Sequence, residues 1–376
     1  MELKKCIVLS DSFKGTLSSG EICRIAKQVF GELAPACDCI ALPVADGGEG
    51  TVDCFLASCG GRLITIEVTG PFPDEKRKVH YAMLGDGTAV IECASSAGLP
   101  LVTDRKDPLR TTTYGIGEQM AHAQANGAGR IILGLGGSAT NDGGCGAAAA
   151  LGVRFFDENN EEFLPTGGTL HRIRRIDTKA LRLKIPVTVM CDVENPLFGE
   201  RGAAYVFAPQ KGADERTVKL LDEGLRSFGS ILEESFGKSF SAMRGAGAAG
   251  GFGAGAAAFF GGSLQKGIDI VLGQIRFDEL LQGCDLVITG EGRLDRQSLS
   301  GKVISGVAKH AKAQNVPVVA LVGSVGEECS ATYAAGISAV FSINRRAQDL
   351  RRSRRFSSLN YRRTLADVLR LILAMK

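Results

Sequence analysis

The chain has 376 residues and a formal net charge of +3, and 44% of its residues are hydrophobic. This length allows about two or three domains with sizeable cores. The small charge does not favour a nucleic-acid or membrane partner, and no apolar run reaches the roughly 20 residues that span a bilayer. The start has no apolar signal core, and the eleven cysteines show no C-x-x-C spacing. We therefore expect a cytoplasmic protein without disulfides or zinc.

The first part of the chain alternates between predicted strands and helices. Leu3–Leu9 and Cys39–Val44 are apolar runs typical of buried strands, and a helical pattern follows each of them. The first strand leads into Asp11-Ser12-Phe13-Lys14-Gly15, and the second leads into Asp46-Gly47-Gly48-Glu49. Alternating strands and helices indicate a parallel sheet covered by helices. In such sheets ligands bind beyond the carboxyl ends of the strands, where both loops are expected to lie.

From about Arg62 the pattern changes to short strands joined by turns, which predicts an antiparallel or mixed sheet. Arg62–Thr69, Arg77–Met83 and Ala89–Cys93 are the predicted strands, and apolar runs at Val187–Cys191 and Ala203–Phe207 follow them. A helix is expected over 214–236.

After Gly273 the first pattern returns, with apolar runs at Leu286–Thr289, Val316–Val322 and Ala339–Phe341 and a helix near 302–314. We therefore predict one discontinuous parallel-sheet domain, 1–65 plus 280–376, that carries an inserted mixed α/β domain, 66–279.

A glycine-rich segment, Gly134–Gly144, reads G-L-G-G-S-A-T-N-D-G-G and lies between an apolar run and an alanine-rich helix. A strand, a glycine loop and a helix together present backbone N–H groups and a positive helix end to an anion. Gly136 and Gly137 permit a close backbone approach. Asp142 adds a carboxylate that could reach a metal ion. The alternative interpretation is a tight turn capped by Asn141 or Asp142.

Three further loops carry polar groups suited to chemistry. Asp192 and Asn195 follow Val187–Cys191, Lys211 lies in P-Q-K-G, and Glu291, Arg293 and Asp295 follow Leu286–Thr289. None of the four histidines lies in such a loop, so general-base work would fall to a carboxylate. Anion-cradling glycines, lysines and carboxylates without histidine fit Mg²⁺-assisted phosphoryl transfer.

Together these loops resemble the type 1 glycerate kinase family, which phosphorylates glycerate with ATP. The matching strings are D-S-F-K-G-T-L-S (11–18), V-A-D-G-G-E-G-T (44–51), G-G-S-A-T-N-D-G-G (136–144), C-D-V-E-N-P-L (191–197), P-Q-K-G-A (209–213), G-A-G-A-A-G-G (245–251) and T-G-E-G-R-L-D (289–295). The resemblance implies a flavodoxin-like, doubly wound domain interrupted by a second domain of mixed-sheet fold. It also implies a cleft between the two and a product usually phosphorylated at the 2-position.

With this resemblance, we expect an ATP- and Mg²⁺-dependent kinase acting on D-glycerate, as a monomer or homodimer. Asp192 would be the carboxylate nearest the reacting hydroxyl, although it could instead cap the turn before Asn195-Pro196. The expected roles are catalysis by Asp192 and Lys14; substrate binding by Asp11, Ser12, Asp46, Gly47, Gly48, Glu49, Asn195 and Lys211; nucleotide binding by Gly136, Gly137, Ser138, Asn141, Asp142 and Gly143; and Mg²⁺ binding by Glu291 and Asp295.

Two other functions have some basis in the sequence. Gly245–Gly250 fits G-x-G-x-x-G with Asp269 about 20 residues further on, which is the spacing of an NAD-binding oxidoreductase acting on a small hydroxy acid. The preceding Lys238–Arg244 is not an apolar strand, however. The segment 345–370 contains nine arginines and two acids, a composition that fits either a nucleic-acid contact or a solvated basic face. We expect the solvated face.

Overall fold

The computed structural model describes residues 2–13, 15–295, 302–326, 330–346 and 350–375. The chain forms two compact units. Unit 1 comprises Met1–Asp46, Ala57–Cys59 and Lys266–Lys376, and unit 2 comprises Gly47–Leu56 and Gly60–Gln265. The chain first leaves unit 1 after Asp46, 19 residues before the boundary predicted at 65/66, and returns to it at Lys266, 14 residues before the boundary predicted at 279/280.

The later division has a clear packing reason. Residues 267–280 form two helices that pack on a helix of unit 1, α11 (Val303–Ala313). Ile268 fills the space beside Gly306, and the ring of Phe277 meets the His310 ring edge-on, with centroids 6.1 Å apart. The segment therefore completes the core of unit 1.

In the described part of unit 1, five strands form one sheet in the order β13-β12-β11-β1-β2, and every pair is parallel. The strands are β1 (Lys5–Ser10), β2 (Asp38–Ala41), β11 (Leu286–Leu294), β12 (Val318–Val325) and β13 (Ala339–Ser342). The described helices assigned wholly to this unit are α1 (Ser19–Leu33), α9 (Gly267–Gln274), α10 (Phe277–Leu280), α11, α12 (Ser330–Ala334), α13 (Leu350–Arg354) and α14 (Ser357–Ala374).

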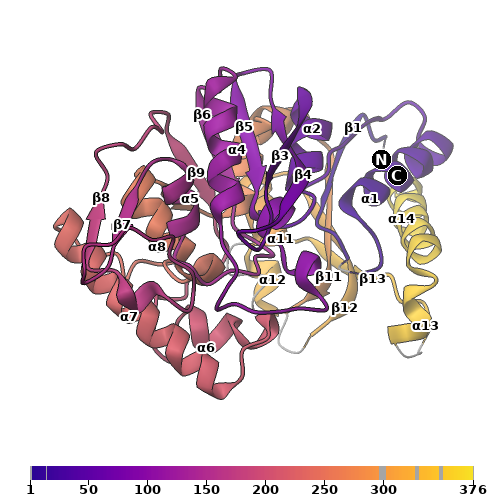
Figure 1. Cartoon of the computed structure of the whole chain (residues 1–376). Helices are drawn as coiled ribbons and strands as arrows, with labels where there is room; N and C mark the ends of the chain where they lie inside the picture. The colour runs from indigo at the N-terminus through magenta and orange to yellow at the C-terminus, as the bar shows by residue number, and fades with distance from the viewer. Residues whose placement is uncertain (1, 14, 296–301, 327–329, 347–349, 376) are drawn as a thin grey trace. The chain divides into compact units, whose positions relative to one another are not determined.

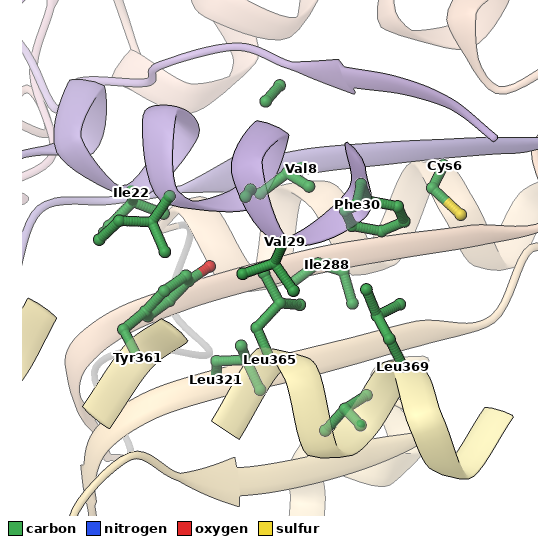
Figure 2. Close-up of a cluster of buried hydrophobic side chains, with 14 of the residues drawn as sticks. Cys6, Val8, Ile22, Val29, Phe30, Ile288, Leu321, Tyr361, Leu365 and Leu369 are labelled. Carbon is green, nitrogen blue, oxygen red and sulfur yellow. The ribbon is translucent and has the colours of Figure 1, made fainter. Parts of the chain in front are cut away.

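Helices α1 and α14 lie side by side on one face of this sheet (Figure 1). Helix α1 begins at a capping box, in which the Ser18 hydroxyl accepts the Glu21 N–H and the Glu21 carboxylate accepts the Ser18 N–H. Figure 2 shows the core beneath the two helices, where apolar side chains of both meet those of the strands. The labelled members are Cys6, Val8, Ile22, Val29, Phe30, Ile288, Leu321, Tyr361, Leu365 and Leu369.

The arginine-rich segment contributes to this packing. Arg345 and Arg370 pair with Asp367 at 2.6 Å and 3.1 Å, and Arg362 pairs with Glu32 of α1 at 2.6 Å. Since these are exposed pairs, each contributes at most about 1 kcal/mol. Three arginines of the segment are nevertheless bound to acidic side chains of unit 1.

In the described residues of unit 2, six strands form the main sheet in the order β10-β9-β6-β5-β4-β3, and β7 and β8 form a small second sheet. The strands are β3 (Arg62–Thr69), β4 (Lys76–Met83), β5 (Thr88–Glu92), β6 (Arg130–Gly134), β7 (Arg154–Phe156), β8 (Arg175–Asp177), β9 (Val187–Met190) and β10 (Ser263–Gln265). Strands β5, β6, β9 and β10 are mutually parallel, whereas β3 and β4 are antiparallel. The carboxyl ends of the four parallel strands therefore meet at one edge.

The described helices of unit 2 are α2 (Thr51–Cys59, whose last three residues are assigned to unit 1), α3 (Cys93–Ala97), η1 (Leu99–Val102), α4 (Tyr114–Ala125), α5 (Cys145–Ala150), η2 (Leu170–Arg172), α6 (Ala203–Phe207), η3 (Pro209–Lys211), α7 (Glu215–Phe236) and α8 (Ala248–Phe260). One core lies on the main sheet and includes Ile91, Leu133 and Phe252. A second core lies under α7, where the Phe155 and Phe259 rings meet edge-on with centroids 5.8 Å apart.

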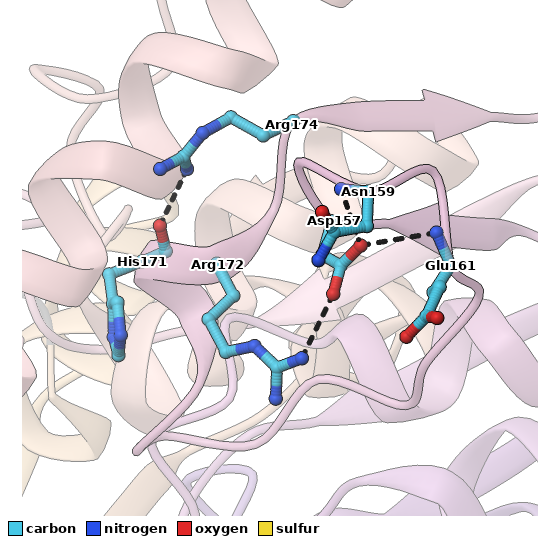
Figure 3. A network of polar contacts seen from close by, with 6 residues as sticks. All are labelled: Asp157, Asn159, Glu161, His171, Arg172 and Arg174. Carbon is cyan, nitrogen blue, oxygen red and sulfur yellow. Dashed lines mark hydrogen bonds and ion pairs between the residues drawn. The ribbon is translucent and has the colours of Figure 1, made fainter.

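A polar network closes the β7 turn (Figure 3). The Asp157 carboxylate accepts the N–H groups of Asn159 at 3.0 Å and Glu161 at 3.1 Å, and it pairs with Arg172 of η2 at 3.0 Å. The Arg174 guanidinium donates to the His171 carbonyl oxygen at 2.7 Å. All of these bonds lie within residues 157–174, so the network stabilises the conformation of the chain between β7 and β8.

Several elements differ in extent from the prediction. Strand β11 continues through Leu294 because it pairs with β12 up to Val325, so Glu291 lies within a strand and not in a loop after it. Strand β2 ends at Ala41, two residues before Pro43, which has no N–H to donate to a ladder. The apolar run Ala203–Phe207 is helix α6. No described helix combines the length and apolar character that crossing a bilayer requires.

Candidate active site

The sheet of unit 1 has a switch point between β1 and β11. Strand β2 lies on one side of β1, whereas the later strands β11, β12 and β13 lie on the other side. Ser10 pairs with Gly290, and the Asp11 N–H donates to the Gly290 carbonyl oxygen at 2.9 Å. Asp11, directly after β1, therefore lies next to the β11 segment that contains Glu291, at the point where the strand order reverses. Open α/β sheets bind ligands at such a point.

The acidic residues of unit 1 differ in exposure. Glu291 is only 6% exposed, whereas Asp11 is half-buried and accepts the Ser12 N–H at 2.7 Å. The Arg293 guanidinium lies 3.9 Å from an Asp295 oxygen, which places both side chains on the same side of β11. Asp46, the last residue of unit 1 before the chain enters unit 2, is half-buried. Lys14 lies outside the described residues.

The number and chemistry of the acidic side chains in unit 1 limit what kind of Mg²⁺ site they could form. Among the residues that the structure describes, no group of three or more His, Cys, Asp or Glu side chains could hold a metal ion. Mg²⁺ is commonly held by one or two carboxylates together with substrate phosphates and water. Glu291 and Asp295 fit that smaller donor set.

In unit 2, the glycine loop after β6 lies directly against the loop that contains Gly47 and Gly48. The Gly136 N–H donates to the Gly47 carbonyl oxygen at 2.9 Å. A Cβ added at Gly136 would lie 2.7 Å from the Cα of Gly48, and one at Gly134 would lie 2.4 Å from the Gly47 oxygen. Only residues without a side chain permit this approach. The fold thus brings together two loops about 90 residues apart.

Lys211 is a buried cation beneath the glycine loop. Its ammonium donates to the Ser138 hydroxyl at 3.1 Å and to the Thr140 carbonyl oxygen at 2.6 Å, and the residue is only 2% exposed. Burial lowers the pKa of Lys211 from 10.5 to about 8, although the nearby Cys93 and Asp142 raise it. The lysine therefore carries a positive charge that the protein compensates only in part.

Asp142 has a structural position in the same loop. Its carboxylate accepts the Thr113 N–H at 2.7 Å, the Thr113 hydroxyl at 2.9 Å, and the N–H groups of Gly144 at 3.0 Å and Gly146 at 3.2 Å. Burial raises its pKa, and these four bonds oppose the rise. The carboxylate therefore caps α5 and ties it to the start of α4. This geometry matches the capping interpretation of the loop.

Asn141 is completely buried beside Asp142. Neither its oxygen nor its nitrogen has a hydrogen-bond partner among the described residues. Gly143 adopts a positive φ of 63° and donates its N–H to the Gly250 carbonyl oxygen at 3.0 Å. Gly137, at the turn of the loop, is exposed, so its backbone is open to a ligand.

Asp192 and Asn195 follow β9 at the same edge of the sheet as the glycine loop, because Met190 pairs with Gly134. Asp192 is exposed. The Asn195 side-chain amide donates to the Arg201 carbonyl oxygen at 2.8 Å, so part of its hydrogen-bonding capacity stabilises its own loop. Glu49, in the loop that contacts Gly136, is exposed as well.

Sequence reasoning missed Glu92. This residue ends β5, is 7% exposed, and accepts the N–H groups of Val52 at 2.8 Å and Gly50 at 3.2 Å. Burial raises its pKa to about 7, with Asp53 and Glu49 adding to the rise and the two N–H donors opposing it. The sequence did contain a signal for this residue: an acidic side chain lies inside the apolar run Ala89–Cys93, and acidic side chains are seldom buried unless they are paired.

The glycines of 245–255 serve close packing. A Cβ at Gly250 would lie 2.2 Å from the Thr140 carbonyl oxygen, and one at Gly247 would lie 2.3 Å from the Pro196 oxygen. The segment before α8 consists of turns, whereas a dinucleotide fingerprint begins from a strand. Three successive residues, Ala249, Gly250 and Gly251, have positive φ, which produces the kink at the start of α8.

An α/β protein with a glycine loop at a strand end, a buried lysine beneath that loop and strand-end carboxylates has the parts of a phosphotransferase. The model of the glycerate kinase family matches residues 6–373. A glycerate kinase of Bacillus cereus is 46% identical over 369 residues, 97% of each chain, and a glycerate 2-kinase of Escherichia coli is 43% identical over 344 residues, 90% of each chain. The crystal structure assigned to a glycerate kinase 2 of Salmonella typhimurium superposes with a TM-score of 0.87 at 39% identity, covering 99% of both chains. The chain belongs to the glycerate kinase family and is therefore a kinase.

Proposed function

We propose that the protein transfers the γ-phosphoryl group of ATP to the 2-hydroxyl of D-glycerate. The observation that carries this proposal is the similarity to glycerate kinases over nearly the whole chain, together with the name glycerate 2-kinase of the Escherichia coli relative. In the reaction, the hydroxyl oxygen forms a bond to the γ-phosphorus while the bond to the ADP oxygen breaks. The hydroxyl proton passes to a carboxylate, for which Asp192 is our candidate.

The glycine loop is the proposed nucleotide site, formed by Gly136, Gly137, Ser138, Asn141 and Gly143. The Gly136 and Gly143 N–H groups are already bonded to the Gly47 and Gly250 carbonyl oxygens, so the features that favour phosphate are the exposed backbone of Gly137 and the Lys211 charge beneath the loop. Lys211 acts on the ligand through Ser138 and Thr140, because its ammonium is bonded to both and is buried. Asp142 supports the loop by capping α5.

The proposed metal ligands belong to unit 1, whereas the proposed substrate-binding residues belong partly to each unit. Glu291 and Asp295 would hold Mg²⁺, which when bound neutralises charge on the transferring phosphoryl group. Substrate binding is assigned to Asp11, Ser12, Asp46, Gly47, Gly48, Glu49 and Asn195, and Lys14 is kept as a catalytic residue. Lys211, which was expected to bind substrate, is reassigned to the nucleotide site because it is buried against Ser138 of the glycine loop.

Two further expectations remain proposals. The strand order of unit 1, read in chain order as 2-1-3-4-5 with all strands parallel, supports a flavodoxin-like domain. The cysteines show no C-x-x-C spacing, and several of them lie in apolar runs, which supports a reducing compartment such as the cytoplasm.

The test is an ADP-release assay over a panel of short hydroxy acids, with ³¹P spectra of the product. We expect turnover with D-glycerate, a 2-phosphorylated product, loss of activity with EDTA and recovery with Mg²⁺. Turnover with another acid but none with glycerate would overturn the substrate assignment, and a 3-phosphorylated product would overturn the position. Tight NADH binding without ATP binding would instead favour the oxidoreductase.

A further inference from the structure

Glu92 joins two loops of the proposed active site although it belongs to neither. It is the last residue of β5, and in the sheet it pairs with Gly134, where the glycine loop begins. Its carboxylate turns to the other loop and accepts the N–H groups of Gly50 and Val52. We propose that Glu92 is a positioning residue of the kinase, which holds the loop 46–50 in its substrate-binding conformation through these two hydrogen bonds.

The loop needs an external anchor at this end. Gly50 is the N-cap of α2, adopts a positive φ of 88°, and has no side chain to cap the helix. Glu92 supplies that cap from a different element, with one oxygen on the Val52 N–H at 2.8 Å and the other on the Gly50 N–H at 3.2 Å. A carboxylate at a helix N-terminus is also stabilised by the helix dipole.

The other end of the loop is fixed against the glycine loop. Gly47 has a positive φ of 88°, and its carbonyl oxygen accepts the Gly136 N–H. A Cβ at Gly47 would lie 2.8 Å from the Cβ of Met190, so this end fits tightly onto the end of β9. Gly48 and Glu49 lie between the two anchors. Releasing the Glu92 anchor would therefore free the polar end of the loop, where Glu49 is exposed.

The anchor is sensitive to pH because of its surroundings. The charged groups that act on Glu92 are Asp53 and Glu49, both acidic, and they add to the effect of burial in raising its pKa to about 7. An ionised carboxylate accepts both N–H groups, one on each oxygen. Below about pH 7 a proton occupies one oxygen, which then no longer accepts an N–H, and one of the two bonds is lost.

The inference rests on the proposed function of the loop, and the test is Glu92→Gln. A glutamine keeps one oxygen that accepts an N–H, but its NH₂ group cannot accept the other N–H, so one of the two hydrogen bonds is lost. At pH 8 and saturating MgATP, we expect the KM for D-glycerate to rise about tenfold, the effect of losing one hydrogen bond to a charged group. Wild-type KM should rise as the pH falls from 8 to 6, and the variant KM should stay flat, so that the two converge near pH 6.

Glu118→Gln is the matched control, because that carboxylate also accepts a backbone N–H, that of Thr69, and its other described bond is to Lys76, which lies outside both loops. Its KM and pH profile should follow the wild type. Hydrogen exchange of the peptide covering residues 47–56 gives a readout independent of turnover. We expect faster exchange at pH 8 in Glu92→Gln than in the wild type.

The outcomes separate the two proposals. If the wild type does not phosphorylate glycerate, the proposed function fails, and the exchange experiment alone decides whether Glu92 anchors the loop. If Glu92→Gln changes only the melting temperature, with wild-type KM and exchange, Glu92 is structural and the inference is wrong. If the variant does not fold, a wild-type KM that is constant from pH 6 to 8 would overturn the inference by itself.

Discussion

Lys211→Met tests the role of the buried charge beneath the glycine loop. Methionine matches the length of the aliphatic chain but has no charge and no donor. It removes the bonds to the Ser138 hydroxyl and the Thr140 carbonyl oxygen. If the loop binds ATP phosphates, the change should weaken ATP binding and leave the KM for glycerate at saturating ATP nearly unchanged.

The size of the effect follows from the pKa of Lys211, which burial lowers from 10.5 to about 8. At about 1.4 kcal/mol per pKa unit, the charged form at pH 7 costs the fold about 3 kcal/mol. Stability is highest above pH 10.5, falls as the pH decreases from about 10.5 to about 8, and is constant below about 8, where the lysine is charged in both the folded and the unfolded state. A bound phosphate that restored the ordinary pKa would recover this energy. The dissociation constant of ATP in Lys211→Met should therefore rise by about tenfold to about 300-fold at pH 7.

The same linkage predicts a pH profile. At pH 7 the lysine is mostly charged and at about pH 8 it is half charged, and above pH 8 each further pH unit should weaken ATP binding by up to about tenfold. The phosphates of ATP are fully ionised over this range and contribute no slope of their own. Calorimetric titrations at pH 7, 8 and 9 in buffers of different ionisation enthalpy would also detect proton uptake on binding. Lys211→Met should show a flat profile and no such uptake.

Lys106→Met is the control, because Lys106 donates to the Gln210 carbonyl oxygen at 3.0 Å in the same loop but is exposed. Its ATP affinity should change less than threefold. An unchanged ATP affinity in Lys211→Met, or a wild-type affinity that is constant from pH 7 to 9, would refute the reasoning. Lys211 would then serve only to hold the loop.

Three further substitutions test the other roles. Asp192→Asn should lower kcat by about two powers of ten, the usual scale for a general base, without changing ATP affinity; near-full kcat with a lower melting temperature would show that Asp192 caps its turn. Glu291→Gln should raise the Mg²⁺ concentration for half-maximal rate about tenfold, and an unchanged Mg²⁺ dependence would exclude it as a ligand. Asp142→Asn should lower the free energy of unfolding of unit 2 by about 3 kcal/mol, because an NH₂ group replaces one acceptor oxygen in a fully buried site. A calorimetric melting temperature within about 2 °C of the wild-type value would contradict this prediction.

The parts of the fold that the sequence predicted are those with strong local signals. The helical pattern expected after Leu3–Leu9 is α1 (Ser19–Leu33), because its capping box and its apolar spacing point to the same element. The strand Arg62–Thr69 has the same bounds as predicted, since its apolar and polar residues alternate. The extension of β11 was not predictable, because Gly290–Leu294 forms a strand only through its pairing with β12.

Site residues were predictable where they follow a strand. Parallel strands end at a common edge, so loops distant in sequence meet there, as Gly47 and Gly136 do. Contacts between side chains distant in the chain were not predictable. The Lys211 bond to Ser138 spans 73 residues, and the Glu92 bond to Val52 spans 40. No pattern of neighbouring residues in the sequence indicates either hydrogen bond.

Asp142 and Lys211 show how the surroundings decide what a charged side chain can do. Asp142 receives four hydrogen bonds, so its oxygens are already occupied by two helix starts, and little capacity remains for a metal ion. Lys211 has three donor hydrogens, and two of them are used. Its charge is incompletely balanced, as its lowered pKa reflects. The carboxylate in the glycine loop is therefore satisfied by the fold, whereas the lysine beneath that loop gains most from an anion, and this difference favours phosphate as the ligand.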